Sequence, residues 1–298
     1  MIRCERATVE RGGNVVAEEV TLRVLPGQAW AVIGRSGAGK SSLLAAAATA
    51  LPLHAGEILV DGHSVRREPE AVRRVVGYVP ARMPAWPGIR VEEFVELFAA
   101  AGALRSDGLQ DAVARAVALA GLANRGHEPL DSLDEGHAKR LLVARAVVHD
   151  PHVLLLDDPF GGLDPLERRD LEQLVADAHL MGRTVLAAVD DGDLPPCFTH
   201  LAVMREGRIV AEGPTDPAAF GAGRRFRYRL TCRGRAEDAA RSMRGLAAEV
   251  RAVDLDHVEA VIDPAALPPS RLVAAVVAAG FEVEAAGFHP SWTAQLLD

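Results

Sequence analysis

Apolar and polar residues follow two periodicities along the chain, one typical of strands and one typical of helices. Short apolar runs bounded by Gly, Pro or Asp predict strands at residues 2–10, 20–24, 30–33, 58–60, 73–79, 153–156, 184–189, 201–204 and 208–211. Apolar residues spaced by three and four predict helices at 91–101, 110–120 and 166–180, a helix up to about residue 50, and a loop followed by a helix within 133–150. Strands that alternate with helices indicate an α/β fold with a mostly parallel sheet, whose ligands bind at the carboxyl ends of the strands.

The pattern changes after residues 221–223, a short Gly-Ala-Gly stretch. Strands are predicted at 226–232, 249–253, 258–262 and 281–285, with helices at 236–246 and 270–279. The order β-α-β-β-α-β is typical of a ferredoxin-like α+β domain. The sequence therefore predicts two domains, residues 1–220 and 221–298. The first should hold a mixed sheet, a small antiparallel part and a helical insert at about residues 88–150.

The segment 30–44 carries the strongest chemical signal of the chain. An apolar strand is followed by Gly34, four residues, Gly39, Lys40 and Ser41, which fits the phosphate-binding loop pattern G-x-x-x-x-G-K-[ST]. Glycines let such a loop curl so that its amides converge on an anion, and the following helix adds the positive end of its dipole. Lysine contacts the terminal phosphates and the serine hydroxyl ligates Mg²⁺. The predicted nucleotide-binding residues are Gly34, Arg35, Ser36, Gly37, Ala38, Gly39, Lys40, Ser41 and Ser42.

Composition supports this interpretation over a glycine-rich turn with a surface lysine. The chain has 33 basic residues, of which only Lys40 and Lys139 are lysines, and one of the two falls where the motif requires it. A net charge of −8 without a basic block argues against nucleic acid as a partner. Three widely spaced cysteines fit no disulfide or metal pattern, so we expect the protein to reside in the reducing cytosol. No apolar run reaches the length of a membrane span, so any role at a membrane should be peripheral.

Further motifs link the loop to a known family. The buried strand 153–156 is followed by Asp157 as in a Walker B motif, residues 162–165 (Gly-Leu-Asp-Pro) match a D-loop, and residues 140–146 resemble the helix after an ABC signature sequence. Residues 1 to about 215 therefore resemble the ATP-binding subunits of ABC transporters. The tail is similar to that of ABC-2 type drug and polymer exporters.

This resemblance carries several implications. It implies ATP and Mg²⁺ as cofactors, with Ser41 and Asp157 at the metal. It implies a homo- or heterodimer with a second ATP-binding domain, in which two ATP molecules are sandwiched between phosphate loops and signature loops. It also implies an integral-membrane transporter subunit as partner, and a cytoplasmic location at the inner face of the cell membrane.

Three single positions and one loop depart from the family's machinery for hydrolysis. Ala81 stands at the Q-loop glutamine, which would help to hold Mg²⁺ and the attacking water, and Asp158 replaces the catalytic glutamate. Asp190 replaces the switch histidine, so a donor becomes an acceptor that repels phosphate. The adenine-stacking aromatic aligns with Arg11, whose planar guanidinium can still stack.

The fourth departure from that machinery is in the signature loop, where Leu-Ser-Gly-Gly-Gln becomes Leu133, Asp134, Glu135, Gly136 and His137. Two like charges about 4 Å apart repel each other by up to ~4 kcal/mol at an effective dielectric of about 20. Two carboxylates that face a partner's bound ATP therefore disfavour a closed dimer. Bland interpretations remain open: Ser132 and Glu135 fit a helix capping box, 190–193 fits a solvated acidic turn, and Ala81 fits a slow ATPase that works by other means.

Two functional hypotheses follow. The first is an ATP-binding subunit of an ABC export system that couples nucleotide-driven dimerisation to a membrane subunit, with weak or lost hydrolysis and Asp158 as residual base. The second is a nucleotide-sensing pseudo-ATPase that regulates or pairs with an active subunit. Residues 83–87, which include Trp86, lie where a membrane subunit would dock, but packing inside the helical insert explains them equally well.

Overall fold

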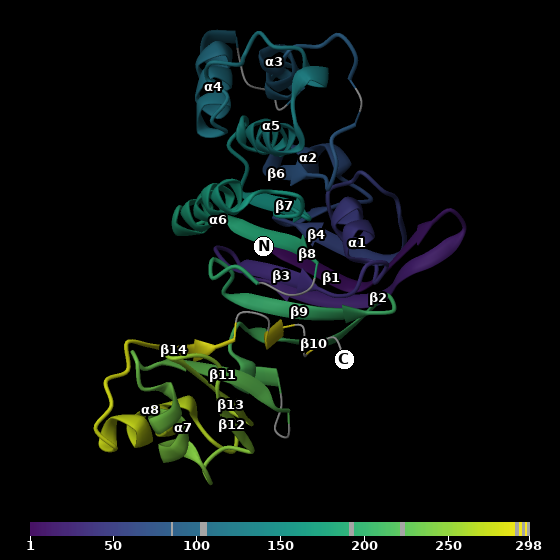
Figure 1. Cartoon of the computed structure of the whole chain (residues 1–298). Helices are drawn as coiled ribbons and strands as arrows, with labels where there is room; N and C mark the ends of the chain where they lie inside the picture. Colours follow the sequence, from purple (N-terminus) through teal and green to yellow (C-terminus); the bar gives the residue numbers. More distant parts are fainter. Residues whose placement is uncertain are drawn as a thin grey trace. The chain divides into compact units, whose positions relative to one another are not determined.

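The computed structural model describes residues 1–84, 86–101, 106–190, 194–220, 224–289, 292–293 and 296. The chain divides into two compact units. Residues 1–190 and 195–211 form the first, and the second comprises described residues of 191–194 and 212–298 (Figure 1). Across the parts of the chain that the structure describes, every helix is too short or too polar to cross a lipid bilayer.

An antiparallel sheet begins the first unit. It consists of β1 (Ile2–Arg11), β2 (Asn14–Val24), β4 (Leu53–Val60) and β5 (His63–Ser64) in the order β2-β1-β4-β5. One face of this sheet is apolar and buried, with Ile2, Leu22 and Ile58 almost fully covered. This is the small antiparallel part that the sequence predicts.

A six-stranded sheet forms the centre of the first unit, in the order β10-β9-β3-β8-β7-β6. Its strands are β3 (Ala29–Ile33), β6 (Val76–Val79), β7 (Val153–Asp157), β8 (Thr184–Val189), β9 (His200–Arg205) and β10 (Arg208–Pro214). The strands from β9 to β6 pair in parallel, and every residue of β3, β7 and β8 is buried. Helix α1 (Lys40–Ala47) contacts strands of both sheets and so lies between them. The predicted parallel α/β core is confirmed.

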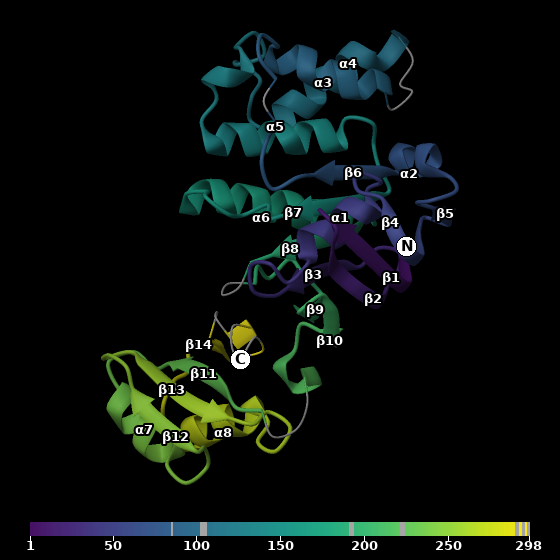
Figure 2. The ribbon, with the colours of Figure 1, turned by 90° about the vertical axis from the view of Figure 1, so that its right-hand side faces the viewer.

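The helices between β6 and β7 gather in one layer of the first unit (Figure 2). They are α3 (Val91–Ala101), α4 (Ser106–Leu119) and α5 (Glu135–Val147), with a short 3-10 turn, η1 (Leu130–Ser132), before α5. Trp86 packs edge-on against Phe94 and Phe98 of α3. Of the two explanations for Trp86, the structure therefore supports packing inside the insert.

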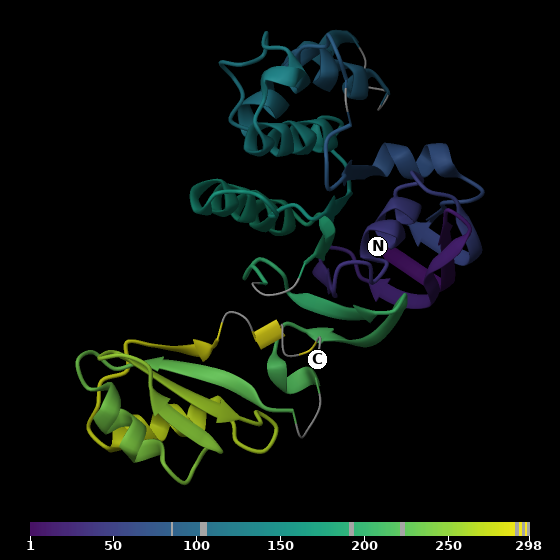
Figure 3. The ribbon, with the colours of Figure 1, turned by 45° about the vertical axis from the view of Figure 1, so that its right-hand side comes forward.

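Helix α6 (Pro165–Leu180) follows β7 and lies next to α5, as the pocket that the two share and Figure 3 show. One local prediction was wrong. Residues 73–75 belong to α2 (Pro69–Val75) and only Val76–Val79 is strand. Pro69 at the first helical position and Glu70 in the first turn are start signals that outweigh the β-branched character of the segment.

The second unit opens with a 3-10 turn, η2 (Pro217–Phe220), and continues as β11 (Phe226–Thr231), α7 (Ala236–Met243), β12 (Glu249–Ala252), β13 (His257–Ile262), α8 (Pro269–Ala278) and β14 (Ala285–Phe288). The sheet is antiparallel in the order β12-β13-β11-β14, and both helices pack on one face. This order confirms the ferredoxin-like α+β domain. The last strand was predicted at 281–285, but Phe281 is buried in the core against the helices and the strand starts four residues later. Residues 221–223 lie outside the described residues.

An ion cluster on this sheet predicts how acid affects the protein. Glu259 is 5% exposed and accepts hydrogen bonds from Arg251 and Arg229. Burial alone would raise the pKa of Glu259, but the two guanidinium groups outweigh it and lower the pKa to about 2. Because the folded-state pKa lies below the unfolded value, the stabilisation is complete above the unfolded pKa and is lost as pH falls toward 2. We expect Glu259→Gln to cost about 2–3 kcal/mol at pH 7 and to flatten stability between pH 5 and 2.

Urea unfolding of the full chain at several pH values measures the free energy of unfolding of the wild type and of Glu259→Gln. The exposed Glu249 on neighbouring β12 provides the matched control, since Glu249→Gln removes the same charge without touching the cluster. If the two variants have the same pH profile, the cluster does not stabilise the unit.

Candidate nucleotide-binding site

The predicted phosphate loop connects β3 to α1 at the carboxyl edge of the six-stranded sheet. Two of its glycines are required by close backbone approach. A Cβ on Gly34 would lie 2.4 Å from the carbonyl oxygen of Met204, and one on Gly39 would lie 2.1 Å from that of Val16. Gly39 also has φ of +102°, which side chains rarely adopt. The loop is therefore held between β2 and the β9–β10 hairpin, a support that the local motif did not reveal.

Lys40 begins α1 and folds back over the loop. Its side chain is 5% exposed, and Nζ donates hydrogen bonds to the carbonyl oxygens of Gly34 (2.6 Å) and Arg35 (3.2 Å). Nζ also lies 2.8 Å from Oδ1 of Asp190, which directly follows β8. The parallel pairing of β3 with β8 brings these two residues together, 150 positions apart in sequence.

The next residue, Ser41, meets the Walker B strand. Its hydroxyl donates to Oδ1 of Asp157 at 2.8 Å, and the backbone N–H of Ala81 hydrogen bonds to the same carboxylate. Burial raises the pKa of Asp157. A hydroxyl beside a carboxylate at the end of a phosphate loop is the donor set with which P-loop proteins hold Mg²⁺, which takes few protein ligands in addition to phosphate and water. The residues present therefore fit a magnesium ion.

The side chain of Asp158 points toward the loop that follows it. The residue has φ of +44°, its N–H donates to the carbonyl of Ala188, and its carboxylate covers Gly161, where a Cβ would lie 2.2 Å from Oδ2. Burial raises the pKa of Asp158, and nearby Asp190 adds to the rise. The carboxylate at the predicted catalytic position thus lies against the turn that follows it.

The second lysine of the chain completes this turn, and sequence reasoning gave it no role. Lys139 of α5 is buried, and its ammonium donates to the carbonyl oxygens of Asp158 (2.8 Å) and Gly161. It lies 4.0 Å from Oδ2 of Asp158. Burial lowers the pKa of Lys139, which the neighbouring carboxylates partly offset. Its rarity was the only signal available, because 31 of the 33 basic residues are arginine.

The predicted signature loop, residues 133–137, lies at the N-terminus of α5. Asp134 is the N-cap and accepts from the backbone N–H of His137 at 2.8 Å, and hydrogen bonds from His137 lower the pKa of Asp134. The capping box predicted from Ser132 and Glu135 was wrong, since the Ser132 hydroxyl donates to the carbonyl of Pro129. The carboxylate of Glu135 lies against Gly162 of the D-loop. Leu133 and Gly136 complete the loop, and Gly136 packs against Glu167 of α6.

Replacing Asp134 separates its structural role from its charge. We expect Asp134→Ala to destabilise the protein by about 1 kcal/mol through loss of the cap, whereas Asp134→Ser keeps a capping hydroxyl and changes stability by a few tenths. Thermal unfolding of both variants provides the measurement. Equal losses in the two would show that the cap contributes nothing. Asp134→Ser should also favour an ATP-dependent dimer by removing one carboxylate, which size-exclusion chromatography with Mg-ATP detects.

Arg11 lies at the exposed end of β1. Burial raises the pKa of the Tyr78 hydroxyl to about 12, and the positive charges of Arg145 and Arg11 act in the opposite direction. Contact with adenine stays a prediction for Arg11. The other members of the predicted acidic turn, residues 191–193, lie outside the described residues.

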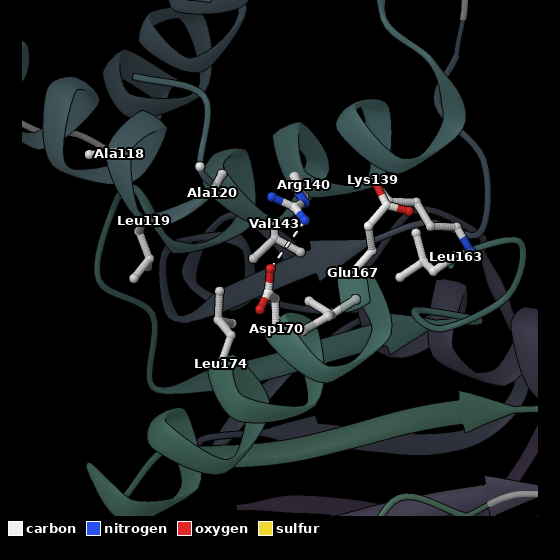
Figure 4. Close-up of a pocket in the computed structure, with 12 residues that line it drawn as sticks. Ala118, Leu119, Ala120, Lys139, Arg140, Val143, Leu163, Glu167, Asp170 and Leu174 are labelled. Carbon is white, nitrogen blue, oxygen red and sulfur yellow. Dashed lines mark hydrogen bonds and ion pairs between the residues drawn. The ribbon is translucent and has the colours of Figure 1, made fainter. Parts of the chain in front are cut away.

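Two cavities adjoin these elements. One of about 180 Å³ lies between the end of α4, α5 and α6, where Arg140 reaches across to Asp170 at 3.2 Å (Figure 4). Another of about 310 Å³ is lined by Tyr78, Phe98 and Arg145, close to the end of β6. Both border the helical insert, and neither contains Lys40 or Ser41.

Fold and site together define a P-loop nucleotide-binding protein. Residues 17–161 match the family model for ABC transporters. The Nod factor export ATP-binding protein I of Cupriavidus metallidurans is 30% identical over 203 residues, which cover 68% of this chain and 67% of that protein. The chain belongs to the family of ABC transporter ATP-binding proteins.

Two further similarities extend this comparison. The linearmycin resistance ATP-binding protein LnrL of Bacillus subtilis is 22% identical over 279 residues, 93% of this chain and 89% of the relative. The dimeric structure of MJ0796, a bacterial ABC transporter cassette, superposes with a TM-score of 0.67 and 22% identity over 72% of this chain and 99% of that one, which confirms the fold. The relatives differ in length. The match covers 10% of the ATP-binding cassette sub-family A member 7 of Rattus norvegicus, 67% of the Nod factor protein and 62% of the Fe(3+) ions import ATP-binding protein FbpC of Streptomyces coelicolor.

Proposed function

We propose that the chain is the nucleotide-binding subunit of an ABC export system, which binds Mg-ATP and acts on a separate membrane subunit. The observation that carries the proposal is the constellation of Lys40, Ser41 and Asp157 at the carboxyl edge of the parallel sheet. In it, the loop amides of residues 34–42 and Lys40 hold the phosphates, and Ser41 and Asp157 hold Mg²⁺, which screens phosphate charge when bound. Export is supported by the relatives named for Nod factor export and linearmycin resistance, and the ABC-2 type is proposed from the resemblance of the tail.

Weak or absent hydrolysis is part of the proposal. Ala81 contributes only its backbone N–H, and a methyl group can neither hold Mg²⁺ nor position water. The Asp158 carboxylate lies over Gly161 beside Lys139 instead of projecting freely from the strand. A displacement of about 1 Å at a reacting centre can cost on the order of a hundredfold in rate. The chain would then work mainly through nucleotide binding.

Dimerisation and location follow from the same proposal. A second ATP-binding domain, identical or different, would close over the phosphate loop with its signature loop, and the pair would sit on the cytoplasmic face of the membrane through the transporter subunit. The cavity lined by Tyr78, Phe98 and Arg145 borders both the helical insert and the end of β6, so it is the place where we expect that subunit to make contact.

The second candidate is a pseudo-ATPase that senses nucleotide and pairs with an active subunit. The Lys40–Asp190 ion pair favours it, because an acid now stands where the family's histidine would contact the terminal phosphate. Phosphate release by the purified chain, alone and with a membrane subunit that co-purifies with it, tests both candidates. Turnover that Lys40→Ala abolishes supports the transporter ATPase. Saturable ATP binding without phosphate release supports the sensor, and stable association with DNA or ribosomes contradicts both.

A further inference from the structure

The ammonium of Lys40 already has a full set of acceptors. An ammonium group carries three N–H donors, and Lys40 directs them at the carbonyl oxygens of Gly34 and Arg35 and at the Asp190 carboxylate, at 2.6, 3.2 and 2.8 Å. A phosphate group can reach this buried ammonium only by displacing one of the three acceptors.

Asp190 is the acceptor that leaves most easily. The two carbonyl groups belong to the loop, and Lys40 itself is only 5% exposed, so their separation requires a change of backbone. The Asp190 side chain is 57% exposed and can rotate into water. Its carboxylate therefore competes with phosphate for the same ammonium, and it does so from inside the chain, at a high effective concentration.

Other carboxylates add to this competition. Asp158 lies near enough to Asp190 for the two charges to interact, and Asp157 lies beside Ser41 at the end of the neighbouring strand. Three acids thus surround one lysine at the edge where the terminal phosphate of a nucleotide would lie. Each further phosphate charge brought to this edge meets the repulsion of these acids, against the attraction of Lys40, the loop amides and bound Mg²⁺.

We propose that Asp190 is a specificity-determining residue, which makes this site favour a nucleoside diphosphate over the triphosphate. This inference rests on the proposed nucleotide binding. Lys40 contacts the β-phosphate of a diphosphate and of a triphosphate, so both nucleotides compete with Asp190, but a diphosphate brings no charge to the position of the γ-phosphate. A triphosphate adds that charge, and Asp190, once displaced, still remains close to it.

Calorimetric titration of the full chain in excess Mg²⁺ tests the proposal, with ADP and the non-hydrolysable ATP analogue adenylyl imidodiphosphate as probes. We expect the wild type to bind ADP about tenfold more tightly than the analogue, which is the effect of one pair of unit charges that water largely screens. Asp190→Asn keeps the shape of the side chain and removes its charge. It should strengthen binding of the analogue about tenfold and change ADP binding by no more than about threefold.

Asp131→Asn is the matched control, because Asp131 is exposed on η1 in the helical insert and its loss changes net charge equally. If the analogue binds as tightly as ADP, or if Asp190→Asn and Asp131→Asn have the same effect, the inference is wrong while nucleotide binding stands. If neither probe binds to the wild type or to Asp190→Asn, the proposed function fails together with the inference.

Discussion

Lys40→Met should abolish nucleotide binding at micromolar concentrations. The substitution keeps an unbranched side chain of similar length in a 5% exposed position but removes the ammonium. Charge-assisted hydrogen bonds contribute about 1.5–3 kcal/mol each. The loss of two of them to phosphate amounts to about 3–5 kcal/mol, which weakens binding on the order of 10²- to 10³-fold. Calorimetric titration with Mg-ADP measures this change.

The control for this substitution is Arg23→Met. Arg23 is exposed on β2, so its replacement removes one positive charge far along the sheet from the phosphate loop. Circular dichroism and thermal unfolding show whether Lys40→Met remains folded, as we expect, since it removes the cost of a buried charge. Retention of wild-type affinity in Lys40→Met would mean that nucleotide binds elsewhere on the chain, and the proposed function would have to be abandoned.

The double variant Asp158→Glu with Lys139→Gln should raise the rate of ATP hydrolysis on the order of a hundredfold. Glutamate adds the missing methylene at the catalytic position. Glutamine at position 139 can still donate to the carbonyl oxygens of Asp158 and Gly161, but it no longer attracts the carboxylate that lies 4.0 Å away. The loss of the Lys139 charge and the added methylene both act on the carboxylate at position 158, so we expect the effects of the two substitutions on the rate to be non-additive.

One single variant and a second double variant provide the controls. Asp158→Glu alone should gain little, because Lys139 continues to hold the longer carboxylate against the D-loop. Asp158→Asn with Lys139→Gln removes the base altogether and should be inactive. Steady-state phosphate release distinguishes these variants. If the double variant is no faster than the wild type although it binds Mg-ATP, then Ala81 or Asp190 limits hydrolysis and the position of Asp158 does not.

Much of the fold could be predicted from local sequence. Continuous apolar runs in β3, β7 and β8 indicated strands buried on both faces, and these strands form the centre of the sheet. The ferredoxin-like order of the tail was also predictable, because each element has its own periodicity. The errors lie at boundaries. Residues 73–75 have β-branched neighbours but follow a proline that starts a helix, and β14 begins late because Phe281 is needed in the core.

The sequence by itself determined the phosphate loop, since Gly34, Gly39, Lys40 and Ser41 stand at the spacing of the motif within residues 34–41. Tertiary structure alone decided what surrounds that loop. Asp190 reaches Lys40 because β3 and β8 pair in parallel, Lys139 reaches Asp158 because α5 packs beside the D-loop, and Trp86 turns into the helical insert. The physical reason is one of range. Local motifs fix torsion angles and nearby donors, whereas the charges of Asp190, Asp158 and Lys139 around the loop come from segments that only the folded domain brings together.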